Sequence, residues 1–423
     1  MIYEEIESII TSLLNLKISD IENIDCTNQM IIVTLSKSKI ACPYCLNKNL
    51  KSKGFYKRKI SLPSSVFKTY TVILRVRRYY CDKCFKTFSD PKNLAPANKK
   101  ISYETTFKVM EMLKSQRVTF KDAAQVNNIS ESTVVRIFDE HCHIPRRKFP
   151  EVMCIDEVYT KINDFDSKYS CLFYDFHNNK LIDVVPSRKK NYLDYYLSRI
   201  DIRERNQVKY VCIDMYKTYK YIVRRYFKKA IICVDSFHVV KTLNDSFENI
   251  RIRTMKRYDS SSNEYYLLKH FNYLLKERNL NLDTQARFNH KLQRYVNLRD
   301  IFMMILKIDE KLELTYYLKE TYMDFNRNCS YEEVEEKFDD IYQLFLESDI
   351  EKYYPFIAAL KHWRYEIINS FIVHNGRRIN NGVAESINAK VSQLIYNTKG
   401  ISNNRRRRKR ILYTVNREGF ILK

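Results

Sequence analysis

Glycine is scarce in this chain, which has only five glycines among its 423 residues. An average protein contains about 7% glycine. No two of the five lie close enough to form a Gly-x-Gly-x-x-Gly loop or a Walker-type phosphate loop. The sequence therefore argues against a Rossmann-type dinucleotide enzyme and against a P-loop nucleotide hydrolase.

Long apolar runs are also lacking. The longest notable run, residues 301–306, is far shorter than the ~18 apolar residues that a membrane-spanning helix needs. The first residues of the chain are acidic, whereas a secretory signal starts with basic residues. We therefore expect a cytoplasmic protein without a membrane segment.

Basic residues, in contrast, are abundant. The chain has 74 Lys and Arg against 50 Asp and Glu, a net charge of +24, and 45% of its residues are hydrophobic. This apolar content is enough for sizeable cores, and the length favours roughly two to four domains. The basic excess favours a polyanionic partner. Nucleic acid is the first interpretation and an acidic membrane surface the weaker one, while an AT-rich genome would explain part of the bias.

The cysteines favour a metal site over disulfides. Their number, eleven, is odd, and four of them form two Cys-x-x-Cys pairs, Cys42 with Cys45 and Cys81 with Cys84. Each pair follows a turn or a strand-like segment, as in a zinc ribbon, and four thiolates form the tetrahedron that structural Zn²⁺ prefers. Unligated core cysteines or a redox pair are the alternatives. We predict a zinc-ribbon domain at residues 1–100.

Residues 101–150 have apolar positions at helical spacing, which predicts three helices and then a basic, proline-bounded linker. Residues 120–141 resemble a helix-turn-helix, with Ser130 as the cap of the second helix. In that motif the start of the second helix contacts base edges, which here would be Ser132, Thr133 and Arg136. An ordinary helical hairpin is the alternative interpretation.

From residue 151 onward, short β-branched segments predict strands that later alternate with helices. The predicted order is βββαβαβ, that of an RNase H-like fold. Asp156 lies within the first strand and Asp214 ends the fourth, and these strands are neighbours in this topology. A buried carboxylate needs a compensating partner, for which a metal ion suffices. Two carboxylates suit Mg²⁺, and a pair of such ions can assist phosphodiester displacement.

A third carboxylate would complete such a site. Glu385 lies in the first turn of a helix predicted at residues 383–396, after a turn that Gly382 permits. We expect Gly376, Gly382 and Gly400 to have backbone conformations that a side chain would disfavour. The alternative is that Glu385 only stabilises the helix macrodipole.

Six segments contain these cysteine pairs and acidic residues, and they follow one another over nearly the whole chain. They are Cys42-Pro-Tyr-Cys45, Leu62-Pro63 with Arg77-Arg-Tyr-Tyr-Cys-Asp-Lys-Cys, Cys154-Ile-Asp-Glu, Ile213-Asp-Met, Ala230-Ile-Ile-Cys-Val-Asp-Ser-Phe-His and Asn381-Gly-Val-Ala-Glu-Ser-Ile-Asn. As an ordered set they resemble the ISL-three family of bacterial insertion-sequence transposases. The resemblance implies DDE chemistry on an RNase H-like core, with Asp156, Asp214 and Glu385 as the catalytic triad and as ligands of two Mg²⁺ ions, for which Mn²⁺ could substitute.

The resemblance also places the family's Asp-x-Phe-His element on Asp235, Phe237 and His238. These residues could support the site, contact DNA, or end the fifth strand and cap the next helix, and the last interpretation is favoured. Residues 241–372 show helical periodicity, which predicts an all-helical insertion domain between residues 151–240 and 373–423 of the catalytic core. Trp363 could stack on a flipped base, but a position in the core is favoured.

A basic run follows the helix that carries Glu385. It consists of Arg405, Arg406, Arg407, Arg408, Lys409 and Arg410. Such a run is ordinarily a solvated segment or a nonspecific phosphate contact. We expect it to border the DNA and to add affinity without sequence specificity.

The sequence thus predicts a multidomain α/β transposase that binds the terminal inverted repeats of its element and cuts and joins them to target DNA. A homodimer is expected, because two DNA ends must be brought together. The main alternative is a catalytically silent, transposase-derived regulator that binds DNA. A second alternative is a structure-selective nuclease of RNase H-like fold.

Overall fold

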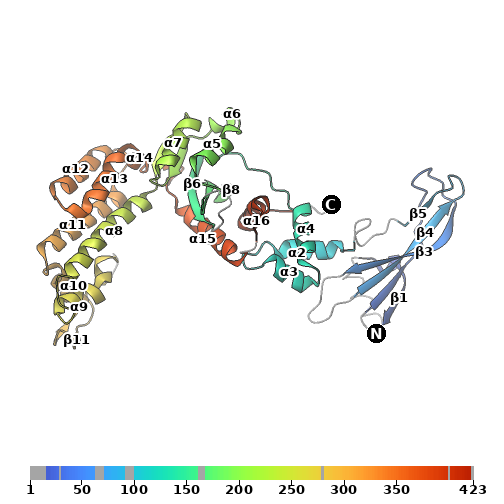
Figure 1. The fold of residues 1–423 in the computed structure, drawn as a ribbon, viewed down its shortest axis with the longest axis horizontal. Coiled ribbons are helices and arrows are strands. Elements are labelled where there is room, and N and C mark those ends of the chain that lie inside the picture. The colour runs from blue at the N-terminus through green and yellow to red at the C-terminus, as the bar shows by residue number, and fades with distance from the viewer. Residues whose placement is uncertain are drawn as a thin grey trace. The chain divides into compact units, whose positions relative to one another are not determined.

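The computed structural model describes residues 16–27, 30–61, 71–90, 100–160, 167–277, 281–398 and 401–420 (Figure 1). The chain divides into two compact units, one of Met1–Arg146 with Ile387–Lys423 and the other of Arg147–Ser386. The sequence predicted that residues 373–423 would belong together with the catalytic core. The division differs because the last helix packs on helices near the N-terminus, as described below.

The first unit contains a five-stranded sheet in the order β1-β2-β4-β3, with β5 paired to β4. The strands are β1 (Ile21–Thr27), β2 (Met30–Leu35), β3 (Leu50–Ser61), β4 (Thr71–Cys81) and β5 (Thr87–Ser89). Strands β2 and β4 are parallel, and the other pairs are antiparallel. Alternate residues of β4, Val72, Leu74 and Val76, are buried against Val33 and Ile60, so one face of the sheet forms a small core.

Four helices of the first unit share a separate core. They are α2 (Tyr103–Met112), α3 (Phe120–Asn127), α4 (Glu131–His141) and α16 (Asn404–Asn416). The ring of Phe138 in α4 packs against Phe120 of α3 and Tyr413 of α16, with centroids 5.5 and 5.8 Å away. Two predicted helix starts are confirmed: Thr119 and Asp122 form a capping box on α3, and Ser130 caps α4.

The second unit is built on a mixed sheet in the order β10-β9-β6-β7-β8. Its elements are β6 (Val152–Tyr159), β7 (Tyr169–Asp175), β8 (Lys180–Val185), α5 (Lys190–Ser198), α6 (Ile202–Arg205), β9 (Tyr210–Ile213), α7 (Lys217–Tyr226) and β10 (Ile231–Val234). Apart from the single turn of α6, they follow the predicted order βββαβαβ. Strand β6 pairs with antiparallel β7 on one side and parallel β9 on the other, which confirms the expected neighbours.

A mainly helical insertion follows β10. Its helices are α8 (Ser236–Met255), α9 (Asn263–His270), α10 (Leu298–Leu306), α11 (Glu310–Asn328), α12 (Val334–Glu347), α13 (Tyr354–His362) and α14 (Arg364–Asn369). Their buried side chains are continuous with the core of the sheet. Trp363 is buried in this core, as the favoured interpretation predicted.

The prediction that the insertion is entirely helical is wrong. A hairpin of β11 (Arg287–Asn289) and β12 (Arg294–Val296) interrupts it. Strands of three residues are too short to produce a recognisable alternation of apolar and polar side chains. The reversal needs one residue in the left-handed region, Gln293 with φ of 51°, in a place without glycine.

A second hairpin, β13 (Val373–His374) with β14 (Arg377–Arg378), leads into α15 (Gly382–Asn397). Its turn residues Asn375 and Gly376 have φ of 51° and 74°, and an Asn-Gly pair between strands is a sequence signal for this turn. The expected unusual conformation is therefore present at Gly376. The φ of Gly382 lies outside the left-handed region, and an added Cβ there would lie 3.1 Å from Asn380 Oδ1. Gly400 lies outside the described residues.

Within the part of the chain that the structure describes, no helix is both long enough and apolar enough to cross a bilayer.

Candidate functional site

Two predicted site residues, Asp156 and Asp214, lie side by side in the second unit. Ile155 of β6 pairs with Ile213 of β9, and each aspartate directly follows one of these residues. The side chains of both aspartates are largely buried, with 9% and 8% of the residue surfaces exposed. The parallel pairing of β6 and β9 thus brings two carboxylates from distant segments to one edge of the sheet.

The electrostatics of this pair are unfavourable without a cation. Burial, together with the negative charge of Asp214, raises the pKa of Asp156 to about 7, despite a hydrogen bond that the backbone N–H of Glu157 donates to Asp156 Oδ1. Desolvation and mutual repulsion both disfavour the ionised forms of these two carboxylates. A nearby cation would stabilise their negative charge.

His238 and Asp235 supply part of the remaining environment. The Nε2 atom of His238 lies 3.0 Å from Asp214 Oδ1, and this contact raises the pKa of His238. Burial raises the pKa of Asp235. Among the described residues, Asp214, Asp235 and His238 form an acidic group whose ligand atoms all lie within 4.8 Å of one another. Asp235 also caps α8 by accepting a bond from Phe237 N–H, as the favoured interpretation predicted.

Asn381 connects this acidic group to the segment before α15. Its backbone N–H donates to Asp235 Oδ1 at 3.2 Å, and its side-chain amide lies 3.4 Å from Asp214 Oδ1. The residue is 2% exposed, and its Oδ1 has no hydrogen-bond partner among the residues that the structure describes. We did not identify Asn381 as a site residue from the sequence, although it stands in the motif that contains Glu385.

Glu385 is placed differently from the two aspartates. It lies in the first turn of α15, as predicted, but its side chain is exposed. Neither Glu385 nor Asp156 belongs to the compact group of Asp214, Asp235 and His238 among the described residues. The three predicted acids therefore lie in the same unit, while the tightest cluster of ligand atoms is built by Asp214 with two residues whose roles the sequence left open.

The residues present fit a hard divalent cation. Carboxylate oxygens with one imidazole nitrogen suit Mg²⁺ or Mn²⁺. The raised pKa of Asp156 and the unpartnered amide oxygen of Asn381 are local features that a cation or its bound waters would satisfy. Asp156, Asp214 and Asp235 are the oxygen donors available on the sheet side of the site.

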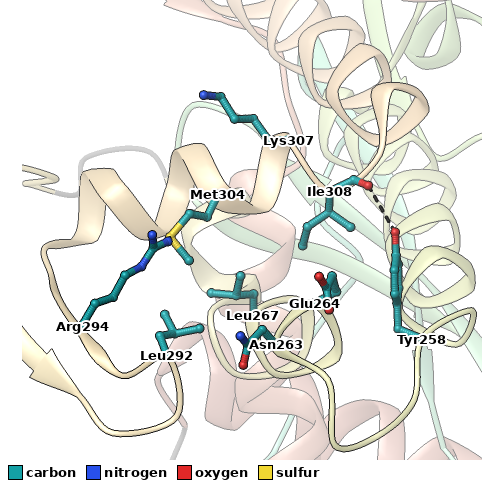
Figure 2. Close-up of a pocket in the computed structure, with 9 residues that line it drawn as sticks. All are labelled: Tyr258, Asn263, Glu264, Leu267, Leu292, Arg294, Met304, Lys307 and Ile308. Carbon is teal, nitrogen blue, oxygen red and sulfur yellow. Dashed lines mark hydrogen bonds between the residues drawn. The ribbon is translucent and has the colours of Figure 1, made fainter.

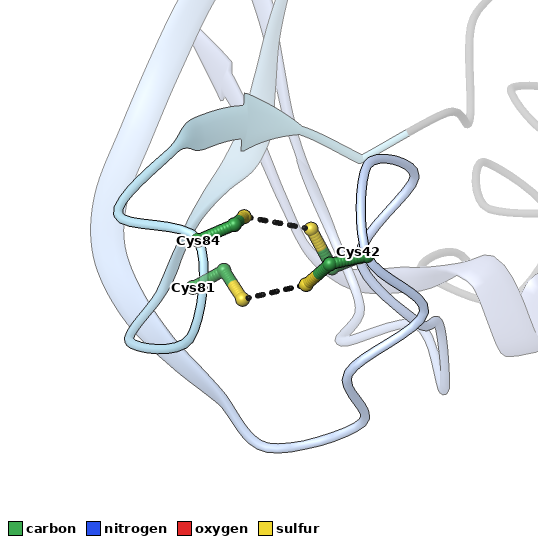
Figure 3. A group of neighbouring side chains, drawn as sticks. Cys42, Cys81 and Cys84 are labelled. Atoms are coloured by element: carbon green, nitrogen blue, oxygen red, sulfur yellow. Dashed lines mark hydrogen bonds between the residues drawn. The ribbon is translucent and has the colours of Figure 1, made fainter.

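The cysteine group lies in the first unit, where Cys42 and Cys45 face Cys81 and Cys84 (Figure 3). The Sγ atoms of Cys42 and Cys84 are 3.5 Å apart, as are those of Cys45 and Cys81, and all four lie within 4.8 Å of one another. Each cysteine pair lies in a tight turn. The residue that follows each pair, Leu46 or Phe85, has a backbone φ in the left-handed region.

The thiols of this cysteine group do not ionise alike. Burial raises the pKa of Cys84 to about 12. Burial opposes ionisation of Cys81 as well, but hydrogen bonds from nearby backbone and side-chain groups lower its pKa to about 6. Four neighbouring thiols can become thiolates together only if a cation compensates their charge, so the group fits Zn²⁺.

The residues predicted to contact bases lie at the start of α4. Ser132 and Arg136 are exposed and Thr133 is half-buried. Ser130 and Thr133 form a hydrogen bond between their hydroxyl groups, 2.8 Å apart, which belongs to the helix cap. The hydroxyl group of Ser132 also lies 2.9 Å from that of Ser130. Arg136 is therefore available to a ligand, while Ser132 and Thr133 also serve local structure.

The basic run forms the first part of α16 and is partly structural. Arg410 is 1% exposed and donates to the carbonyl oxygens of Ser115 and Val118 at 3.1 and 2.8 Å. Arg406 pairs with Asp139 of α4 at 2.6 Å. Arg407 is also buried, whereas Arg405 is exposed and Arg408 and Lys409 are half-buried. The ordinary interpretation of such a run as a solvated segment does not hold for Arg407 and Arg410, which are buried three residues apart on one side of α16. The expected contact of the run with DNA stays a prediction.

Two family comparisons agree with these sites. Residues 153–411, more than half of the chain, match the DDE transposase model of the ISL-three (ISL3) type. Residues 38–84, which contain all four cysteines of the cysteine group, match the model described as the zinc-finger of transposase IS204/IS1001/IS1096/IS1165. No protein in a set of curated sequences matches the chain. With buried paired aspartates in the first matched region and a four-cysteine group in the second, the chain belongs to the ISL-three family of transposases.

Proposed function

We propose that this chain is the transposase of an insertion sequence, which binds the terminal inverted repeats and carries out DNA strand cleavage and strand transfer. The observation that carries the proposal is the buried pair Asp156 and Asp214 on adjacent parallel strands, inside the region that matches the transposase family. The strand order and the βββαβαβ sequence of elements support an RNase H-like core.

In the proposed reaction, water attacks a phosphodiester at the end of the element and the P–O3′ bond breaks. The products are a 5′-phosphate and a free 3′-hydroxyl group. That hydroxyl then attacks a phosphodiester of the target, so that a new P–O3′ bond forms and a target 3′-hydroxyl leaves with the proton. Neither step requires a nucleotide cofactor or a covalent protein intermediate.

The side chains of the second unit would prepare this site. Asp156, Asp214 and Glu385 would hold two Mg²⁺ ions, which would supply charge neutralisation and activation of the phosphodiester. His238 orients the carboxylate of Asp214 through its 3.0 Å contact. Asn381 holds Asp235 and Asp214 from the opposite side. Glu385, exposed in the first turn of α15, is the third acid that would close the site around DNA.

The first unit would bind the repeats. Its helices α3 and α4 are joined by a short turn and carry the exposed Ser132 and Arg136, which supports a helix-turn-helix. The zinc ribbon adds a second DNA-binding element, and Arg405 is the exposed end of the basic run. Binding by a homodimer follows from the need to hold two DNA ends.

The test is an assay of Mg²⁺-dependent nicking and joining on DNA that carries the element's own terminal repeats. Asp156→Asn should abolish both products while repeat binding persists. A matched control is Asp201→Asn, because Asp201 caps the short helix α6 and asparagine caps equally well. Equal cleavage by the wild type and Asp156→Asn would refute the assignment of Asp156.

The same assay separates the alternatives. Repeat binding without any cleavage by the wild type would identify a catalytically silent regulator. Cleavage without a strand-transfer product, and without preference for the repeats, would identify a structure-selective nuclease.

A further inference from the structure

The β11–β12 hairpin lies at the end of the insertion that is farthest from strands β6 and β8 (Figure 1). Phe288 of β11 pairs in register with Tyr295 of β12, and their rings meet edge to face with centroids 5.3 Å apart. Phe288 is 40% exposed and Tyr295 is 72% exposed. A third ring, that of His290, lies 5.2 Å from Phe288. The hairpin therefore presents a cluster of aromatic rings to solvent.

Cations flank these rings along the hairpin: Arg287 and Arg294 lie on the face opposite to Phe288 and Tyr295, and Lys291 lies in the connection between the two strands. Arg287, Lys291 and Arg294 are all exposed, and residues 284–299 contain four Lys or Arg and no Asp or Glu. Lys291 donates to the carbonyl oxygen of Ser261, and Arg294 contacts the sulfur of Met304. Among the described residues none of these three cations has an ion pair with an acidic side chain, whereas the nearby Arg299 is paired with Asp283. Lys291 still has an acidic neighbour, because hydrogen bonds from Ser261 and the charge of Lys291 lower the pKa of Asp259. The charges of Arg287 and Arg294 are thus the ones most available to an anionic ligand.

The charge of the insertion is strongly polarised. Residues 241–308 contain 13 Lys or Arg against seven Asp or Glu, whereas residues 309–352 contain five against 14. The helices α11 and α12 are therefore acidic in an otherwise basic chain. A polyanion would be repelled by that part of the insertion and attracted by the part that carries the hairpin.

A cavity of about 470 Å³ lies on the Arg294 side of the hairpin, away from the exposed rings (Figure 2). Leu292, Arg294 and Met304 line one part of it, and Lys307, which follows α10, lines another. Glu264 also lines the cavity, so two basic side chains and one acidic side chain face it.

We propose that the β11–β12 hairpin binds DNA that contains unpaired bases, and this inference rests on the proposed function. Arg287, Lys291 and Arg294 would contact phosphates, which needs no particular base. Phe288 and Tyr295 would stack on bases, and a ring can do so only where a base has left the duplex. Cations alone would suffice for paired DNA, so the exposed rings are what points to opened or single-stranded DNA.

The test compares the affinity of the full chain for two fluorescent DNAs, a duplex and the same duplex with a single-stranded 3′ tail, without added divalent cation. Tyr295→Ala should weaken binding of the tailed DNA roughly 5-fold to 100-fold and leave duplex binding nearly unchanged. Tyr295→Phe should retain the wild-type preference. Arg294→Ala should weaken both DNAs and reduce the slope of log affinity against log salt by about 0.7–0.9.

Matched controls are available on α11. Tyr317 is 60% exposed and Lys311 is also exposed, but both lie in the acidic part of the insertion. If Tyr295→Ala changed tailed-DNA binding no more than Tyr317→Ala does, while the wild type still bound and cut its repeats, the hairpin proposal would be wrong and the proposed function would stand. If the wild type bound neither DNA, both would fail.

Discussion

The cysteine group and the acidic group are both built for a cation, but they are assembled in different ways. The four cysteines come from two turns at the ends of neighbouring strands, and each turn supplies two adjacent ligands. The acidic group gathers Asp214 from β9, Asp235 and His238 from the start of α8, with Asn381 from the segment before α15. The first is closed by four thiols, whereas the second contains an unpartnered polar atom, Asn381 Oδ1, and Glu385 stays exposed in the first turn of α15.

This difference separates a structural role from a catalytic one. A site closed by four protein ligands has no position for a substrate, whereas an active site must keep one open. We therefore expect changes in the cysteine group to affect folding and DNA binding, and changes in the acidic group to affect the reaction.

The largest effect is expected for Asp214→Asn. Asp214 contacts His238 and Asn381 and repels Asp156, so its replacement removes charge from the centre of the acidic group. We expect repeat cleavage to fall by on the order of 10³-fold or more, with unchanged zinc content. Gel assays of nicking and metal analysis of the same protein would measure both. Substantial cleavage by this variant would contradict a catalytic role for the acidic group.

The next effect is expected for Cys81→Ser. Loss of one ligand should release zinc and unfold the turns that hold the cysteine group, since structural zinc sites couple metal binding to folding by on the order of 10 kcal/mol in small zinc domains. Binding of the repeats should weaken, while cleavage at saturating DNA should persist. Metal analysis and hydrogen exchange over residues 30–90 would report the change.

Cys142→Ser is the control, because Cys142 is a buried cysteine outside the group. Less than about half an equivalent of zinc in the wild type, unchanged in Cys81→Ser, would exclude the zinc site.

A smaller effect is expected for His238→Ala. If His238 positions Asp214, its loss should reduce cleavage about 10–100-fold and raise the Mg²⁺ concentration needed for half-maximal rate. A residue that only stabilises the fold would lower stability without altering this Mg²⁺ dependence. Thermal unfolding together with a Mg²⁺ titration distinguishes the two outcomes, and His238→Gln, which retains a hydrogen-bond donor, should recover part of the activity.

The smallest effect is expected for the stability of the metal-free protein as the pH changes. The pKa of Asp156 is about 7 in the folded state and 3.8 in its ordinary environment, so the folded state binds more protons between these values. Stability should therefore fall as pH rises from about 4 to 7, by at most about 1.4 kcal/mol per pH unit from this residue. The raised pKa of His238 acts in the same direction. Urea unfolding in chelator-treated protein would show the trend, and Asp156→Asn should flatten it. Carboxylates of the same unit with lowered pKa values, such as Glu248 and Asp283, act in the opposite direction. The same pH dependence in the wild type and in Asp156→Asn would therefore contradict the burial of an uncompensated pair.

Much of the second unit could be predicted from local sequence. The β-branched segments around Asp156 and Asp214 indicated strands, and their order predicted that β6 and β9 are neighbours. The cysteine group could be predicted equally well, because its ligands lie in two Cys-x-x-Cys pairs. Capping by Thr119 and Ser130 followed from side chains that act on the next few residues.

Other features depend on contacts that no local pattern reveals. The burial of Arg410 requires the carbonyl groups of Ser115 and Val118, almost 300 residues away in the chain. The hydrogen bond from Asn381 to Asp235 likewise joins residues that are far apart in the sequence. Charge and composition do not distinguish the buried from the exposed residues of the basic run, because they carry no information about which face of a helix packs against the core. The hairpin in the insertion was missed since its strands are too short to show a period.

The packing of α16 on α2, α3 and α4 also sets an order of events during synthesis. Tyr413 donates to the carbonyl oxygen of Met110 and Arg410 reaches the loop after α2, so the core of these helices is made from two segments of the chain that are far apart in sequence. A ribosome would release α2–α4 long before α16, and the second unit would emerge between them. The helices proposed to read DNA therefore complete their core only after the second unit and α16 have been synthesised, and a shortened chain that ends before α16 would carry them without their full support.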